Sequence, residues 1–301
     1  MKIYRTIQRY YLIIKKINES NFPTFDKIRE CLSDNHFPIS PRTLQRDIEN
    51  IRWDFHIEIK YDMARKGYYI DMEESGDFDD YMRFFEMSMI SGSLTEAIKD
   101  SKNLKRFISF DKSDDLLGIE YFNKILFAIQ NHDVIKILYQ RFNDDSEPYE
   151  EKIAPILLKE YQKRWYVVAK LLRKNEIRTY GLDRIKGYQL TDEKYLEADV
   201  EIIKEKFENI IGIGFYDNEP EIVELSFTPE QGKYVKTLKW HHTQKEIEGE
   251  EDEYRIQLFV GRNFELEQKI MNVGDQVKVI RPEWLKDIII KRYKNFIKNN
   301  S

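Results

Sequence analysis

Cysteine is nearly absent from this chain, and the chain contains no long apolar run. The single cysteine, Cys31, excludes a disulfide within the chain and fits a reducing compartment. A membrane-spanning helix needs about 18 or more consecutive apolar residues, and a secretory signal needs an apolar core near its start. The sequence has neither, so we expect a cytoplasmic protein with no membrane partner.

Motifs that carry enzyme chemistry are also missing. The sequence has no glycine-rich phosphate loop, no His-Glu-x-x-His pattern, no paired cysteines and no pattern that predicts a nucleophilic triad. The pair His241 and His242 invites a metal interpretation, but we expect both on a strand, where consecutive side chains point to opposite faces. No third ligand is placed beside them. We therefore expect neither an enzyme nor a cofactor or metal site.

The chain has 301 residues, of which 41% are hydrophobic, so it can bury more than one core and two or three domains are expected. Its net charge is −5, but the charge is unevenly distributed. Residues 1–70 hold 13 Lys/Arg against 9 Asp/Glu, about +4, which leaves about −9 for the rest. A phosphate-binding surface is the usual reason for such an asymmetry.

Residues 1–72 contain three helical patterns followed by two short strands. Helices are expected at 4–17, with a stripe of Ile7, Tyr11 and Ile14, and at 24–32. A third should begin after an N-cap at Ser40. The apolar residues of this third helix recur at helical spacing, so its opposite face is left for solvent or a ligand. That face carries side chains that can hydrogen-bond base edges or phosphates, namely Arg42, Thr43, Gln45, Arg46, Glu49 and Asn50.

Strands at 57–61 and 67–70 flank a basic tip, Arg65-Lys66, which predicts a wing beside the third helix. The alternative is a three-helix domain used for protein contacts. The run Ile39-Ser-Pro-Arg-Thr-Leu-Gln-Arg-Asp-Ile48 resembles the recognition helix of winged helix-turn-helix repressors of the DeoR type. We therefore predict a winged helix-turn-helix domain with these DNA-binding residues: Ser40, Arg42, Thr43, Gln45, Arg46, Arg65 and Lys66.

An acidic segment follows at 71–80, which we interpret as a linker with little reason to pack. Residues 78–97 predict a helix whose methionine-rich face packs or dimerises. Most of 102–115 is expected to be loop, with one possible strand at 107–110. Residues 73–115 would together form a helical linker between two domains.

Residues 116–198 predict a helix at 116–130 followed by five short strands, at 134–139, 152–158, 165–171, 177–182 and 185–190. A helix followed by five closely spaced antiparallel strands suggests a small Sm- or SH3-like β-barrel. The fourth strand places Arg178, Tyr180 and Leu182 on one face. On residue types alone, two interpretations of this face are open: a site for an anionic or stacking ligand, and a solvated strand end with one ion pair.

The triplet Trp165-Tyr166-Val167 and the run Arg178-Thr-Tyr-Gly-Leu-Asp-Arg-Ile185 resemble the core of a WYL domain, a family with the Sm-like fold. The resemblance implies a nucleic-acid or nucleotide-like ligand. Two positions depart from the family pattern: Ile156 replaces a polar residue, and Gly181 replaces a second arginine. The residues that the resemblance places at the ligand are Tyr139, Lys152, Trp165, Arg178 and Arg184.

Residues 199–219 are expected to form a connector, and 220–301 show strand and helix patterns in the order βαββαβ, which is ferredoxin-like. A capping box, Thr228-Pro-Glu-Gln231, opens the first helix of this part. The segment resembles the WCX extension that usually follows a WYL domain. The predicted fold is therefore an α+β multidomain protein: winged helix-turn-helix, WYL barrel and ferredoxin-like WCX domain.

These features predict a DNA-binding transcriptional regulator associated with the nucleoid. As a homodimer it would bind a double-stranded operator with an inverted repeat, since one winged helix buries little DNA surface. Its WYL domain would sense the effector, and the family suggests a setting in DNA-damage or phage-defence control. The alternative is a constitutive dimeric DNA-binding protein whose barrel has no ligand.

Overall fold

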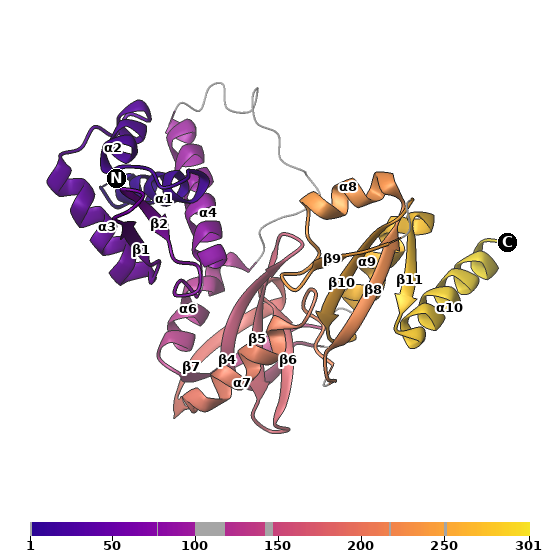
Figure 1. Ribbon diagram of the computed structural model, residues 1–301. Coiled ribbons are helices and arrows are strands. Elements are labelled where there is room, and N and C mark those ends of the chain that lie inside the picture. The colour runs from indigo at the N-terminus through magenta and orange to yellow at the C-terminus, as the bar shows by residue number, and fades with distance from the viewer. Residues whose placement is uncertain (1, 77, 100–117, 142–146, 217, 250–251) are drawn as a thin grey trace. The chain divides into compact units, whose positions relative to one another are not determined.

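The structure is a computed structural model that describes residues 2–76, 78–99, 118–141, 147–216, 218–249 and 252–301. The chain is an α+β protein, and it divides into two compact units, Met1–Asp111 and Lys112–Ser301. Figure 1 labels most of the elements of both units. Each unit has apolar cores of its own.

The N-terminal unit contains four helices and one hairpin among its described residues: α1 (Lys2–Glu19), α2 (Phe25–Asp34), α3 (Pro41–Phe55), β1 (Ile59–Asp62), β2 (Gly67–Ile70) and α4 (Phe78–Lys99). The predicted stripe of α1 was incomplete. The residues that α1 buries fully are Tyr10, Ile13, Ile14 and Ile17, whereas Ile7 and Tyr11 lie at the edge of the core. The stripe shifts because α1 packs against α2, α3 and α4 together.

Local signals set the starts of α2 and α3. The Thr24 hydroxyl accepts a hydrogen bond from the Lys27 amide, and the Ser40 hydroxyl accepts one from the Thr43 amide. Pro41 occupies the first turn of α3, where a missing N–H does no harm. These caps confirm the predicted helix starts.

The antiparallel strands β1 and β2 pair Ile59 with Ile70, and both side chains pack on the helical core. Helix α4 also packs on this core, through Phe78 and Phe85. Three other apolar side chains of α4, Phe84, Met87 and Ile90, are exposed. The predicted loop at 102–115 and the possible strand at 107–110 lie outside the described residues.

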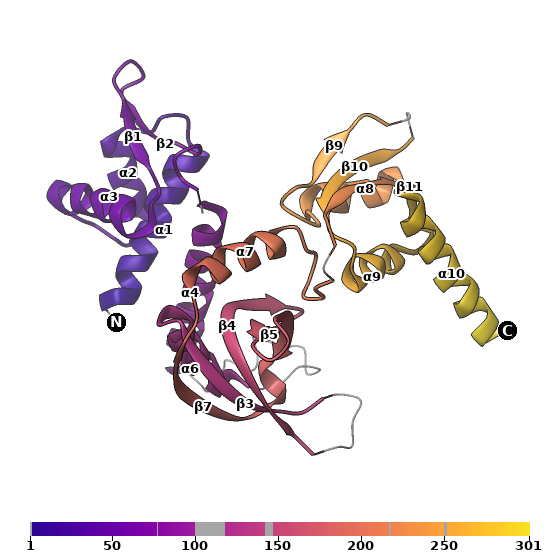
Figure 2. The ribbon, with the colours of Figure 1, turned by 90° about the horizontal axis from the view of Figure 1, so that it is seen from below.

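The C-terminal unit begins with α6 (Ile119–Gln130) and an antiparallel sheet with strand order β6-β5-β4-β3-β7. Figure 2 shows these strands curving. The 3-10 turn η1 (Leu182–Arg184) joins the two edge strands, β6 and β7. The strands are β3 (Asp133–Tyr139), β4 (Tyr149–Tyr161), β5 (Arg164–Leu171), β6 (Glu176–Gly181) and β7 (Ile185–Lys194).

Both faces of this sheet are covered. Alternate residues such as Ile135 and Ile137 pack toward α6, while Val134 and Ala154 pack toward α7 (Glu197–Glu208). Ile156, one of the two departures from the WYL pattern, is 1% exposed in the apolar cluster beneath α7.

The last part of the chain has a sheet of strand order β11-β8-β10-β9, antiparallel throughout, with its core against α9 and α10. Figure 2 shows α9 and α10 beside this sheet. Strand β9 begins at residue 245 and not at 242, so the expectation that His241 and His242 lie on a strand was wrong. Their ring centroids are 4.2 Å apart in the preceding turn. The elements are β8 (Glu221–Phe227), α8 (Pro229–Thr237), β9 (Lys245–Ile247), β10 (Tyr254–Val260), α9 (Phe264–Val273), β11 (Val277–Arg281) and α10 (Glu283–Asn300).

Candidate functional sites

Two groups of side chains stand out, one in each unit. The first lies on α3 and the β1–β2 hairpin. We call it the helix–hairpin face and define it by Ser40, Arg42, Thr43, Gln45, Arg46, Arg65 and Lys66.

Three side chains of α3 on this face have no structural task. Arg42, Gln45 and Arg46 are exposed, and within the part of the chain that the structure describes they make no hydrogen bond or ion pair. The hydroxyls of Ser40 and Thr43, in contrast, lie 2.9 Å apart and share a hydrogen bond. The first turns of α3 therefore present two cations and an amide on a start that the cap holds rigidly.

The opposite face of α3 is anchored by a buried ion pair that the sequence did not reveal. Arg9 of α1 donates to both carboxylate oxygens of Asp47, at 2.8 and 3.1 Å, and the Asp47 side chain is 1% exposed. The Asn50 amide donates to the Tyr10 hydroxyl at 3.0 Å, so Asn50 turns toward α1 and away from the predicted groove-facing surface. These contacts fix the rotation of α3 about its axis.

The hairpin tip is ordered by local contacts. The Asp62 carboxylate accepts from the amides of Ala64 and Arg65, at 2.8 Å each, and the Arg65 guanidinium lies 4.1 Å from the centroid of the Phe22 ring. Lys66 is exposed with a φ of 51°. Both predicted tip cations face solvent at the end of the hairpin.

A hollow of about 480 Å³ lies between α3 and the hairpin. Two cations, Arg52 and Lys60, line it together with Gln45. Its other lining residues are Ile48, Glu49, Ile59, Tyr61, Tyr68 and Tyr69.

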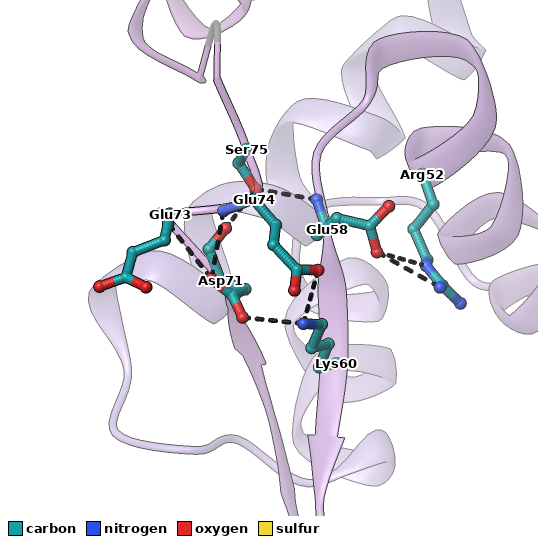
Figure 3. Close-up of polar contacts among 7 residues, drawn as sticks. All are labelled: Arg52, Glu58, Lys60, Asp71, Glu73, Glu74 and Ser75. Carbon is teal, nitrogen blue, oxygen red and sulfur yellow. Dashed lines mark hydrogen bonds and ion pairs between the residues drawn. The ribbon is translucent and has the colours of Figure 1, made fainter.

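The acidic segment after the hairpin packs, contrary to the sequence-based expectation of a loose linker. We call residues 71–75 the acidic turn. Its Ser75 is 3% exposed and its hydroxyl bridges strand β1 to the turn, accepting from the Glu58 amide at 2.9 Å and donating to the Asp71 carbonyl at 2.6 Å. Figure 3 shows the turn gathered around Lys60 of β1. The expectation failed because it weighed the charge of the segment and not the lysine that the hairpin brings beside it.

The second group lies in the C-terminal unit and centres on three tyrosines, Tyr139, Tyr149 and Tyr180, which we call the tyrosine cluster. The Tyr139 ring meets the Tyr180 ring edge-on at 4.9 Å and the Tyr149 ring at 6.1 Å. The Tyr139 hydroxyl accepts from the Gly181 amide at 3.1 Å, and burial raises the pKa of Tyr139 to about 12. The rings come from different strands: pairing of β3 with β4 places Tyr139 opposite Tyr149, whereas β3 and β6 do not pair, and the curvature of the sheet brings Tyr180 to Tyr139.

The Tyr180 hydroxyl is the unusual member. It is buried, and it has no hydrogen-bond partner among the described residues. Burial and then the negative charge of Glu151 raise its pKa, whereas the charge of Arg178 lowers it. A buried hydroxyl normally finds a partner, and a water molecule would supply one here.

Cations surround the cluster. The Arg184 guanidinium lies 5.1 Å from the Tyr139 ring centroid, and that of Arg141 lies 4.7 Å from the Tyr149 ring. Arg173 donates two hydrogen bonds of 3.0 Å to the buried Glu151. Tyr139 and Tyr180 are buried, at 4% and 3% exposed, and the arginines that could hold a phosphate lie beside the rings of Tyr139 and Tyr149.

Three of the five predicted ligand residues meet here: Tyr139, Arg178 and Arg184. Arg178 forms an ion pair of 3.0 Å with Glu176 on its own strand. The other two predicted residues lie apart from the cluster. The Trp165 ring packs on Phe122 of α6 at 4.7 Å, and Lys152 forms an ion pair with Glu193.

Lys152 lies apart from the tyrosine cluster because side chains alternate between the two faces of a strand. Its neighbour Ile153 belongs to the core that contains the tyrosines, so Lys152 points to the other face of β4. The sequence reasoning also left Tyr149, Arg141 and Arg173 out of the site.

Asp183, next to Arg184 in η1, forms an ion pair of 3.3 Å with Arg164, and the Arg184 guanidinium lies 4.0 Å from the other carboxylate oxygen of Asp183.

Comparison with known families fits this layout. The profile of the WYL domain matches residues 120–190, and that of the WCX domain matches residues 219–296. The chain carries a WYL domain followed by a WCX domain. No catalytic family is among the matches. No match among curated proteins was found.

Two solved structures resemble the chain at low identity. Proteasome accessory factor B/C (PafBC) of Arthrobacter aurescens is 14% identical, with a TM-score of 0.29, over 95% of this chain and 52% of that one. A CRISPR Cas-related protein is 12% identical, with a TM-score of 0.40, over 100% of this chain and 87% of that one. The chain thus spans about half the length of PafBC. In the described part of the chain, no helix is both long and apolar enough to cross a bilayer.

Proposed function

We propose that the N-terminal unit is a winged helix-turn-helix domain that binds a double-stranded DNA operator. In this proposal α3 enters the major groove and the hairpin is the wing. The observation that carries the proposal is the set of three unengaged polar side chains, Arg42, Gln45 and Arg46, on the capped first turns of α3. The N-terminal turns are where a recognition helix contacts base edges.

Replacing Arg42 or Arg46 by alanine tests this proposal. An arginine that reads a base should contribute about 1–3 kcal/mol to operator binding, whereas one that meets a phosphate gives a smaller loss for every sequence. Arg83→Ala on α4 is the matched control, because it removes one exposed arginine from another surface of the same unit. Wild-type affinity of the Arg42/Arg46 double variant at moderate salt would contradict the assignment.

We further propose that the WYL domain is an Sm-like barrel whose tyrosine cluster binds a nucleic-acid or nucleotide-like effector and modulates operator binding. The support is the pair of arginines over the Tyr139 and Tyr149 rings, with the unpaired Tyr180 hydroxyl in the same cluster. Stacking on one ring contributes about 1–3 kcal/mol per base. A change in melting temperature on adding single-stranded DNA or nucleotides would support this sensing role.

The competing proposal is a constitutive DNA-binding protein with a structural barrel. Two observations favour it: Arg178 and Lys152 already have carboxylate partners, Glu176 and Glu193. Arg178→Glu separates the two proposals, because a sensor should lose its response while still binding operator. If the variant folds, binds operator and responds as the wild type does, the effector site is not the tyrosine cluster.

The WCX domain, in this proposal, is ferredoxin-like and helps to hold a homodimer that binds an inverted repeat. The observed element order and the strand order β11-β8-β10-β9 support the fold assignment. The exposed apolar residues of α4, Phe84, Met87 and Ile90, support a second contact between copies.

A further inference from the structure

Lys60 lies on the hairpin with its ammonium group held by two carboxylates of the acidic turn. Its Nζ is 2.8 Å from Oδ2 of Asp71 and 2.6 Å from Oε2 of Glu74 (Figure 3). Its neighbour in the hollow, Arg52, lies 3.3 Å from a carboxylate oxygen of Glu58. Both cations of the hollow therefore have carboxylate partners in the free protein.

The acidic turn is a built structure and not a loose acidic run. The second oxygen of Asp71 accepts from the amides of Glu73 and Glu74, at 3.2 and 3.3 Å, and Ser75 ties the turn to β1. The turn leads into α4, where the Phe78 amide donates to the Ser75 carbonyl at 3.3 Å. Backbone contacts thus fix the Asp71 carboxylate and the path of the turn that carries Glu74.

Lys60 and its two carboxylate partners lie next to the helix–hairpin face, because Lys60 and Gln45 line the same hollow. The geometry stabilises the charged form of both partners: hydrogen bonds to Asp71 and Glu74 raise the pKa of Lys60, and the bond to Lys60 lowers the pKa of Asp71. Carboxylate oxygens at these distances occupy the positions around an ammonium group that phosphate oxygens would take.

We propose that the acidic turn competes with the DNA backbone for Lys60, so that it restrains DNA binding in the free protein and yields Lys60 as a phosphate contact when displaced. The proposal rests on the proposed DNA-binding function of this unit. It assigns a regulatory task to a segment that lies outside the helix–hairpin face.

Two matched substitutions test the competition. Glu74→Gln removes a carboxylate that touches Lys60, and Glu73→Gln removes one from the same turn with no such contact, so both change the net charge equally. The probe is a mixed-sequence duplex of about 30 base pairs, followed by fluorescence anisotropy between about 50 and 200 mM salt. Because Glu74 is exposed, we expect Glu74→Gln to bind about two- to five-fold more tightly than Glu73→Gln at the low-salt end.

The same experiment in a Lys60→Gln background isolates the lysine. If Lys60 is the group released, the tighter binding of Glu74→Gln relative to Glu73→Gln should disappear in this background. With Lys60 present, the affinity of Glu74→Gln should depend on salt more steeply than that of Glu73→Gln, by about one phosphate contact. An advantage that persists without Lys60 would overturn the proposal, since it would then reflect general charge alone.

The outcomes also separate this proposal from the proposed function. Suppose that the wild type binds DNA and that Arg46→Ala binds it more weakly. Equal binding by Glu74→Gln and Glu73→Gln would then overturn only the competition for Lys60. A folded wild-type chain that binds no duplex at low salt would overturn the DNA-binding function and the competition with it.

Discussion

Asp47 is a single residue whose buried charge holds α3 while the other face of that helix stays free. Its carboxylate is almost fully buried and receives both hydrogen bonds from Arg9, whose side chain is 14% exposed. A buried pair of this kind contributes little when intact, but losing one partner leaves the other charge without compensation.

We therefore expect Asp47→Ala to lower the free energy of unfolding of the N-terminal unit by about 3–5 kcal/mol. Urea unfolding followed by circular dichroism would measure it. Asp54→Ala is the control, because Asp54 is exposed on the same helix and makes no hydrogen bond or ion pair in the described part of the chain. Equal effects of the two substitutions would show that the Arg9 pair does not anchor α3.

His241 gives a second prediction at this scale, in the turn before β9. Burial, and next the charge of His242, lower the pKa of His241 to about 4, and its Nδ1 accepts from the Thr243 amide at 3.3 Å. An unfolded histidine has a pKa of about 6.5, so between these two values the unfolded state binds more protons. Stability should therefore fall as the pH drops below about 6.5 and level off below about 4.

Because the ring is only partly buried, we expect this loss to reach about 1–2 kcal/mol. Urea midpoints across that pH range would measure it, and His241→Gln should flatten the curve. His36→Asn, which replaces an exposed histidine with a φ of 66°, should leave the slope unchanged. An unchanged slope in His241→Gln would assign the acid sensitivity to other groups.

At the scale of elements, Gly118 shows how one residue sets the start of α6. Its φ is 80°, and a Cβ there would lie 2.1 Å from the carbonyl carbon of Leu182 in η1. The helix therefore begins at Ile119. The sequence pattern had predicted a start at residue 116. A backbone-to-backbone approach of this kind admits no side chain.

We expect Gly118→Ala to destabilise the WYL domain by more than about 2 kcal/mol, since the left-handed conformation alone accounts for about 1–3 kcal/mol. Thermal unfolding would measure this. Gly76→Ala should be neutral or slightly stabilising, because no atom lies within 4 Å of the added Cβ. A neutral Gly118→Ala would mean that α6 and η1 separate readily.

At the scale of the whole molecule, the exposed apolar residues of α4 bear on assembly. Phe84 and Ile90 are each 63% exposed, on a helix whose Phe85 is 2% exposed in the core. Such residues on one element favour contact with a second copy, and two half-sites are the usual basis of specific operator binding.

We predict a homodimer in light scattering at micromolar concentration, weakened at least about tenfold by Phe84→Glu. Arg83→Glu, on the same helix beside it, is the control for added negative charge. A wild-type chain that is monomeric under these conditions and still binds a single half-site tightly would contradict the prediction.

The local parts of the fold could be predicted from sequence alone. The caps at Thr24 and Ser40, the strand runs of the WYL sheet and the order of elements in the WCX domain all depend on residues close together in the chain. Hydrogen bonds and apolar periodicity within one turn or one strand carry these signals, so no distant partner is needed to interpret them.

Partnerships between distant residues were decided only by the tertiary structure. The curvature of the sheet brings Tyr139 of β3 to Tyr180 of β6, and helix packing joins Arg9 to Asp47. The sequence predicts a loose linker at the acidic turn, whereas in the structure the hairpin places Lys60 beside its carboxylates. Composition and spacing determine which charges and rings a segment carries, but burial and pairing depend on atoms that lie 11 to 41 residues away in these examples.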